Sequence, residues 1–259
     1  MKVSEPWRFA GRVIALALLA GAFPAALAAQ DDNSGTNPIA FTWDFRFYPE
    51  AQSRSGDNSF QTFTFEHRVP LSSNWQFRTK SSFASSTVDT PGGNVTTSGF
   101  GDTSVRLLHI PMAGPKFALA LGLEAFLNTA SQPNLGEGRT SLGPQLFAVF
   151  FGALGEGTLI APAYQYQFDI AGDDGRAKVS RSLVDLFIVW IAPSKKFWLI
   201  ADPQFIFDHE NDRNWTQLEF EAGSMMFGPT SNYIRPSIGI GDDKTYDWSI
   251  EFGFKVIWR

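Results

Sequence analysis

The sequence contains no cysteine and only three histidines. Without cysteine there is no disulfide framework, no thiol nucleophile and no Cys-based metal site. Lysine and arginine together number 21 against 26 aspartates and glutamates, which gives a net charge of −5. Nucleic-acid binding depends on an excess of Lys and Arg that neutralises phosphates. We therefore predict no cofactor, no metal and no nucleic-acid partner.

Long apolar runs are missing beyond the first thirty residues. Residues 1–29 have a basic start, an apolar stretch and an alanine-rich end, an order typical of a secretory signal peptide cleaved after Ala28 or Ala29. The alternative, an uncleaved membrane anchor, is disfavoured because the apolar stretch is short for a span. No later run approaches the roughly 18 apolar residues of a membrane-spanning helix. The remaining chain, 30–259, has the length of one domain.

Alternation of apolar and polar residues is the main pattern in that remaining chain. It is clearest at the C-terminus, where one face of a predicted strand carries Trp248, Ile250, Phe252, Phe254, Val256 and Trp258. The other face carries Glu251 and Lys255. Successive side chains of a strand point to opposite faces. The apolar face is buried in a core if the protein is soluble, and faces lipid if the strand belongs to a membrane barrel.

The same alternation recurs in twelve segments, at residues 41–47, 59–69, from 75, 103–107, 117–124, 141–151, 160–169, 181–190, 197–207, 217–226, 234–240 and 245–259. Connectors after even segments are short, whereas those after odd segments, such as 86–97 and 128–140, are mostly longer. Outer-membrane barrels alternate short periplasmic turns with longer outer loops, and aromatics near segment ends fit interfacial girdles. We predict an all-β fold, a transmembrane antiparallel up-and-down β-barrel of about 12 strands. A soluble secreted sandwich or barrel is the alternative.

In such a barrel the polar faces point into the lumen. We expect basic side chains on the first four segments and acidic ones on segments seven to ten to form roughly opposite walls. Arg46, Arg78 and Arg106 would then face Asp185, Asp202 and Glu219 across a constriction. The alternative is a set of ion pairs that fills a narrow barrel. The candidate pore-lining or substrate-binding residues are Arg46, Arg78, Lys80, Arg106, Glu124, Phe147, Asp185, Phe187, Asp202, Glu219, Glu221 and Arg235.

Catalytic motifs are absent from the sequence. No serine stands beside a histidine with a following asparagine, and no Gly-Xaa-Ser-Xaa-Gly elbow is present. His209 lies in an acidic stretch, Asp-His-Glu-Asn-Asp, that we interpret as a solvated outer loop. His67 and His109 fall near predicted strand ends. We therefore predict that the protein is not an enzyme.

Several glycine-containing motifs support a family resemblance. Residues 99–102 read Gly-Phe-Gly-Asp and open a strand; an Ala/Leu/Gly-rich segment at 117–127, Gly-Glu-Gly at 136–138 and Gly-Pro at 143–144 follow. This part of the chain, to about residue 151, resembles the phenol-degradation (meta-pathway) family of outer-membrane barrel channels. It departs from that family's Leu-Pro-Thr-Gly, because residues 127–130 read Leu-Asn-Thr-Ala. The resemblance implies passage of small, often hydrophobic or aromatic compounds.

These observations together predict a channel in the outer membrane of a Gram-negative-type bacterium, for passive uptake of small molecules. Its partners would be outer-membrane lipid and a small solute. Two alternatives remain open: a non-conducting structural or adhesion barrel, and an outer-membrane barrel hydrolase. Only a short polar lead precedes the first segment, unlike the long plug of fatty-acid channels, and no segment indicates a subunit contact.

Overall fold

The computed structural model describes residues 35–258, so the predicted signal peptide lies outside the described residues. Within this range the chain forms thirteen strands. They are β1 (Trp43–Ser53), β2 (Ser59–Ser72), β3 (Trp75–Val88), β4 (Val95–Phe100), β5 (Thr103–Ala113), β6 (Phe117–Leu127), β7 (Arg139–Phe151), β8 (Thr158–Gly172), β9 (Ser180–Ile191), β10 (Phe197–Asp208), β11 (Arg213–Met225), β12 (Thr230–Ile240) and β13 (Trp248–Trp258). Within the described residues, no helix is long and apolar enough to cross a membrane.

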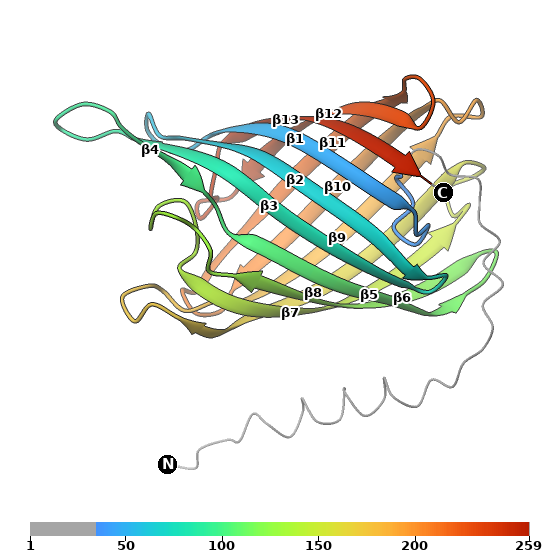
Figure 1. Cartoon of the computed structure of the whole chain (residues 1–259), viewed down its shortest axis with the longest axis horizontal. Coiled ribbons are helices and arrows are strands. Elements are labelled where there is room, and N and C mark those ends of the chain that lie inside the picture. Colours follow the sequence, from blue (N-terminus) through green and yellow to red (C-terminus); the bar gives the residue numbers. More distant parts are fainter. Residues whose placement is uncertain (1–34, 259) are drawn as a thin grey trace, which may run out of the picture.

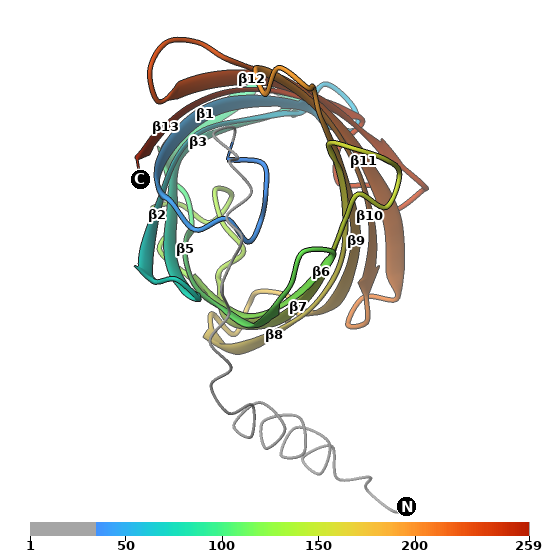
Figure 2. The same ribbon diagram turned by 90° about the vertical axis from the view of Figure 1, so that its right-hand side faces the viewer.

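The strands close into a single antiparallel barrel (Figures 1 and 2). Neighbours in sequence pair with one another, and β1 pairs with β13, so that Trp43 lies opposite Trp258. β4 and β5 together occupy one position, because β5 pairs with the first half of β3 and β4 with its second half. The thirteen strands therefore make a twelve-position barrel, which confirms the predicted fold class.

The break between β4 and β5 falls on Gly101 and Asp102, within the glycine-containing motif. The Gly101 amide donates to the Ser82 carbonyl, and a Cβ at Gly101 would lie 2.6 Å from the Ser82 Oγ. The Asp102 carboxylate accepts hydrogen bonds from the backbone amides of Thr129, Ala130 and Glu137 at 2.7–3.1 Å. This aspartate therefore leaves the barrel ladder to fix the connector between β6 and β7.

The two faces of the wall follow the predicted alternation. Apolar side chains point outward on every long strand, as on β13, where Trp248, Phe252 and Trp258 are each about half exposed. The inward residues of the same strand include Lys255, which is only 1% exposed. An exposed apolar outer face with charges buried inside is the reverse of a soluble barrel and matches a wall solvated by hydrocarbon.

The connectors differ from the sequence-based expectation most clearly between β3 and β4. Residues 86–97 were expected to form a loop, but β3 continues to Val88 and β4 begins at Val95, so only 89–94 connect them. Serine and threonine dominate this stretch and gave no apolar alternation. They pair instead across the hairpin, as Thr87 does with Thr96 at 2.9 Å between hydroxyls. The prediction missed a strand held by backbone and hydroxyl hydrogen bonds.

The segment before β1 turns into the barrel. Figure 2 shows the blue start of the described chain inside the ring of strands. Ile39 is 3% exposed and belongs to the main apolar cluster, together with Leu108, Ala120 and Ile200 from three different strands. The short polar lead expected from the sequence ends at Asn37, and Ile39, just after it, anchors the segment to the inner wall.

Candidate functional site

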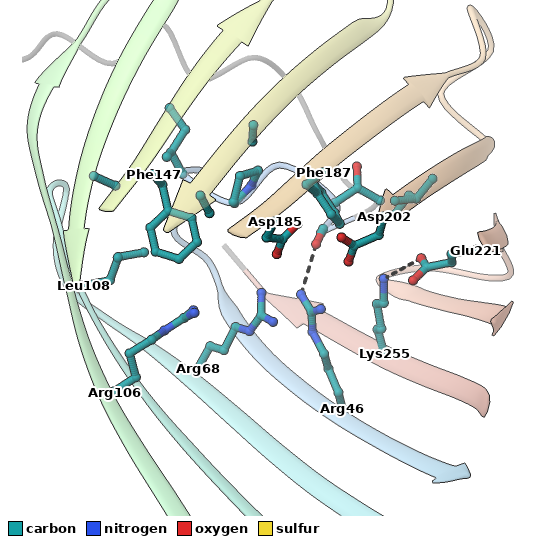
Figure 3. Close-up of a pocket in the computed structure, with 18 of the residues that line it drawn as sticks. Arg46, Arg68, Arg106, Leu108, Phe147, Asp185, Phe187, Asp202, Glu221 and Lys255 are labelled. Atoms are coloured by element: carbon teal, nitrogen blue, oxygen red, sulfur yellow. Dashed lines mark hydrogen bonds and ion pairs between the residues drawn. The ribbon is translucent and has the colours of Figure 1, made fainter. Parts of the chain in front are cut away.

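A cavity of about 220 Å³ lies inside the barrel, between the inward-turned lead and the wall (Figure 3). Its lining comes from the lead and from eleven strands, so residues distant in sequence meet there. They are Gly35, Thr36, Pro38, Ile39, Arg46, Arg68, Arg106, Leu108, Ala120, Phe147, Ala161, Ala163, Asp185, Phe187, Ile200, Asp202, Glu221, Arg235 and Lys255.

One side of the cavity is a network of ion pairs centred on Glu221 of β11. Its carboxylate accepts from the Trp198 Nε1 at 2.6 Å, from the Lys255 Nζ at 3.3 Å and from Arg235. Lys255 is fully enclosed, with its ammonium 4.5 Å from the Tyr233 ring centroid and 5.1 Å from that of Trp198. A buried cation is tolerated only when it is paired and hydrogen-bonded, and Glu221 with the two aromatic rings meets that need.

The network continues on β1 and β2. Arg46 forms an ion pair with Asp44, and its Nη2 also donates to the Gly35 carbonyl at 3.0 Å, which ties the lead to the wall. The Arg68 Nε lies 2.5 Å from a Glu66 oxygen. We call Arg46, Arg68, Glu221, Arg235 and Lys255 the paired wall, because each has an oppositely charged partner.

A second group of charges, further round the barrel, is paired away from the cavity. Arg78 of β3 forms an ion pair with Glu124 of β6, which also accepts from Ser104 at 2.7 Å and Gln145 at 2.8 Å. The Lys80 ammonium lies 5.7 Å from the Tyr48 ring centroid. The acids that neutralise the basic strands therefore come largely from the same side of the barrel, not from the opposite wall.

The other side of the cavity is apolar. We call its lining residues on β5 to β9 the apolar arc, which consists of Leu108, Ala120, Phe147, Ala161, Ala163 and Phe187. The alanines are small and leave open space beside the two phenylalanines. On the paired wall, long charged side chains take up the corresponding space. Figure 3 shows Phe147 between Leu108 and Asp185, with Phe187 close to Asp185 and Asp202.

Three charged residues border the apolar arc and have atoms without partners. Within residues 35–258, the Arg106 Nε, one Asp185 oxygen and one Asp202 oxygen are buried with no hydrogen-bond partner. Arg106 forms no salt bridge to any described residue, since Glu124 nearby is taken by Arg78. Asp202 receives one bond, from the Gln204 Nε2 at 3.2 Å. The Asp185 and Asp202 carboxyl groups are also hydrogen-bonded to each other. The single atom of each of the three residues that has no partner is an exception to the rule that buried polar groups are satisfied.

Of the twelve residues proposed from the sequence, eight line this cavity and four do not. Arg78, Lys80, Glu124 and Glu219 lie elsewhere on the inner wall, and Glu219 is 3.9 Å from the Arg235 Nε. Sequence reasoning placed Arg68 and Lys255 inward without selecting them. It missed Ile39 entirely, because an isolated isoleucine in a lead segment carries no periodic signal.

One contact bears on the hydrolase alternative. The Ser182 Oγ lies 2.9 Å from the His209 Nε2, a pair that the sequence did not reveal because 26 residues separate them. The same hydroxyl lies 3.0 Å from the Tyr164 OH. No carboxylate among the described residues is hydrogen-bonded to the His209 ring, so the third group that orients a catalytic base is missing. We assign this cluster to the aromatic belt of the outer face.

The remaining histidines are also girdle residues. The His109 ring stacks on Trp75 with centroids 4.2 Å apart, and the His67 ring lies 6.0 Å from that of Trp43. The described part of the chain contains no group of three His, Cys, Asp or Glu side chains placed to hold a metal ion.

Neither a family model nor a curated protein matches this sequence. Solved structures do match the fold. The COG4313 outer membrane channel from Pseudomonas putida F1 is 13% identical, with a TM-score of 0.63 over 84% of this chain and 95% of that one. The KdgM porin is 10% identical, with a TM-score of 0.58 over 83% and 99%. The NanC porin is 12% identical, with a TM-score of 0.57 over 84% and 99%. The chain therefore has the fold of outer-membrane β-barrels.

Proposed function

We propose that this protein is a porin-like channel of the Gram-negative outer membrane, which admits small molecules by passive diffusion. The observation that carries the proposal is the cavity inside a closed barrel whose outer face is apolar. A solute would pass between the paired wall and the apolar arc, because these two groups of residues line the cavity. The similarity in fold to solved porins and to a channel supports this proposal.

The apolar arc supports the finer part of the proposal, passage of solutes with a hydrophobic or aromatic body. Phe147 and Phe187 supply aromatic surface, and the neighbouring alanines leave room for a ring. This agrees with what the resemblance to the phenol-degradation family implies. In the sequence, only the alternating pattern, which places both phenylalanines on the inward face, indicates that they line the lumen.

The second candidate is a non-conducting barrel, and the lead segment favours it. Ile39 is packed against Leu108 and Ala120, and Arg46 holds the Gly35 carbonyl. A barrel of this size can be filled by side chains rather than open. In that case the ion pairs and the lead serve stability alone.

Single-channel recording decides between these candidates. Residues 30–259 would be refolded in detergent, checked for β-structure by circular dichroism and inserted into a planar bilayer with a salt gradient. We expect discrete conductance steps. A folded protein that inserts into the bilayer and stays silent to ions and to aromatic solutes would establish the non-conducting barrel.

A further inference from the structure

Arg106, Asp185 and Asp202 stand out among the residues of 35–258 that have a buried polar atom without a hydrogen-bond partner. Nine side-chain atoms in this range are buried without a hydrogen-bond partner. Only those of Arg106, Asp185 and Asp202 belong to residues that line the cavity. A buried ionised group without a partner costs several kcal/mol. The cavity is lined by one cation, Arg106, that forms no salt bridge within residues 35–258, and by a pair of carboxyl groups, Asp185 and Asp202, that are hydrogen-bonded to each other rather than to a cation.

The surface between these charges is suited to a ring. Going round the barrel from Arg106 on β5 to Asp185 on β9, the cavity lining on β6 to β8 is Ala120, Phe147, Ala161 and Ala163, without a polar side chain. The volume of about 220 Å³ exceeds the roughly 150 Å³ of an apolar cavity that accepts benzene. It falls below the roughly 300 Å³ at which drug-sized pockets begin. One ring with a short polar arm fits this space.

We infer that the cavity is a binding site for a zwitterion with a compact apolar or aromatic body, of the kind found in an aromatic amino acid. The carboxylate would pair with Arg106, the ammonium with Asp185 and Asp202, and the ring would lie on Phe147. Figure 3 shows the arginines extending from one side of the cavity toward the two aspartates on the other. The inference rests on the proposed channel function, for which it names a substrate class.

A simple organic anion or cation satisfies this site less well. An anion would pair with Arg106 and leave Asp185 and Asp202 without a counter-charge, and a cation would leave Arg106 unpaired. Arg68 lines the cavity beside Arg106, but its guanidinium already contacts Glu66. Only a ligand carrying both charges supplies an anion to Arg106 and a cation to the Asp185–Asp202 pair.

Binding is measured on the folded protein in detergent by isothermal titration calorimetry, which does not require conduction. Four probes separate the contributions of the amine, the carboxylate and the ring to binding. They are L-phenylalanine, which has all three groups, 3-phenylpropionate, which lacks the amine, phenethylamine, which lacks the carboxylate, and glycine, which lacks the ring. We expect L-phenylalanine to bind at least about tenfold more tightly than each of the other three, since a hydrogen bond to a charged group is worth a factor of about ten or more.

Variants assign the contacts. Arg106→Gln is expected to weaken L-phenylalanine at least about tenfold and to leave phenethylamine unchanged. Asp185→Asn with Asp202→Asn is expected to weaken L-phenylalanine equally and to leave 3-phenylpropionate unchanged. Retained binding of phenethylamine by Arg106→Gln, and of 3-phenylpropionate by the double aspartate variant, shows that each variant is folded. Arg213→Gln and Asp243→Asn, which break a salt bridge away from the cavity, are the matched controls.

Equal affinity for L-phenylalanine and 3-phenylpropionate would overturn the zwitterion assignment in favour of an organic-anion site. No binding by any of the four probes to a protein that forms channels would also overturn it, while leaving the proposed function intact. Conversely, L-phenylalanine binding with the expected variant pattern in a protein that never conducts would support the site and refute the channel.

Discussion

The two sides of the lumen handle charge in opposite ways. On the paired wall, Glu221 contacts Trp198, Arg235 and Lys255, and every cation has a carboxylate partner. Arg235 also pairs with Glu251 at 3.2 Å. Beside the apolar arc, Arg106 forms no salt bridge to a described residue, and the Asp185 and Asp202 carboxyl groups are hydrogen-bonded to each other rather than to a cation. Ion pairs that are fully satisfied fix structure, whereas unpaired charges are available to a solute. Charge density alone therefore does not locate a binding site in this barrel; the pairing of the charges does.

The strongest way to break the paired wall is Glu221→Gln. Glutamine keeps an acceptor for Trp198, but it removes the charge that neutralises the fully enclosed Lys255. Removing one partner of a buried pair costs about 3–5 kcal/mol, so we expect a loss of that size. Urea unfolding in detergent micelles measures it. Glu156→Gln, in an exposed turn, is the control, and a loss no larger than the control's would show that Glu221 is not structural.

Close packing within the paired wall is tested by Gly253→Ala. A Cβ at Gly253 would lie 1.8 Å from the Tyr233 ring, which also donates its hydroxyl to Glu251 at 2.6 Å. The ring must shift away from Lys255, and overpacking of this kind costs about 1–3 kcal/mol. Gly175→Ala meets nothing within 4 Å and should be neutral in the same unfolding assay. Equal stability of the two variants would mean that the Tyr233 ring moves freely.

Deleting the lead segment tests whether ions pass through the cavity that this segment helps to line. Deleting residues 30–40 removes Ile39 from the apolar cluster and Gly35 from Arg46. We expect a higher single-channel conductance, because the lead contributes lining to the cavity on the pore path. Deleting 91–93, in the exposed connector between β3 and β4, is the control. An unchanged conductance after the first deletion would place the narrowest point elsewhere.

The alternating pattern of the sequence predicts which face of the wall each residue occupies. Alternation has a period of two, so it fixes which face a residue occupies. It placed Phe147 and Lys255 inward correctly, and it resolved the ambiguous segment at 141–151, where Leu146 is 43% exposed and Gln145 is buried. The outward tryptophans and short turns then implied the barrel.

The pairing of charges could not be read in the same way. Whether Arg78 meets Glu124 or an acid across the lumen depends on strand stagger and side-chain reach, which alternation does not encode. The expected arrangement of three bases facing three acids consequently included Arg78 and Glu219, neither of which lines the cavity. Arg78 pairs with Glu124, and Glu219 lies 3.9 Å from the Arg235 Nε. Likewise, Ile39 enters the lumen through a non-periodic segment. The Ser182–His209 contact joins β9 to the first residue after β10, and the register of these two strands sets its position.

The last prediction compares an unpaired charge with a paired one through ion selectivity. Arg106→Gln removes a cation that lines the cavity and has no ion-pair partner among residues 35–258. The double variant Arg78→Gln, Glu124→Gln removes an ion pair without changing net charge. Because a solute in the pore responds to the net field of its lining, we expect the reversal potential in a salt gradient to shift toward cation selectivity for Arg106→Gln and to stay nearly constant for the double variant.

This shift is the smallest effect of the four, because solvated pore charges are screened by salt over about 10 Å at 0.1 M. The recording is therefore made at low ionic strength and repeated at high salt, where the shift should shrink. A larger shift for the double variant than for Arg106→Gln would reverse the comparison: permeating ions would then pass beside Arg78 and Glu124, and the orphan charges by the apolar arc would lie off the conduction path.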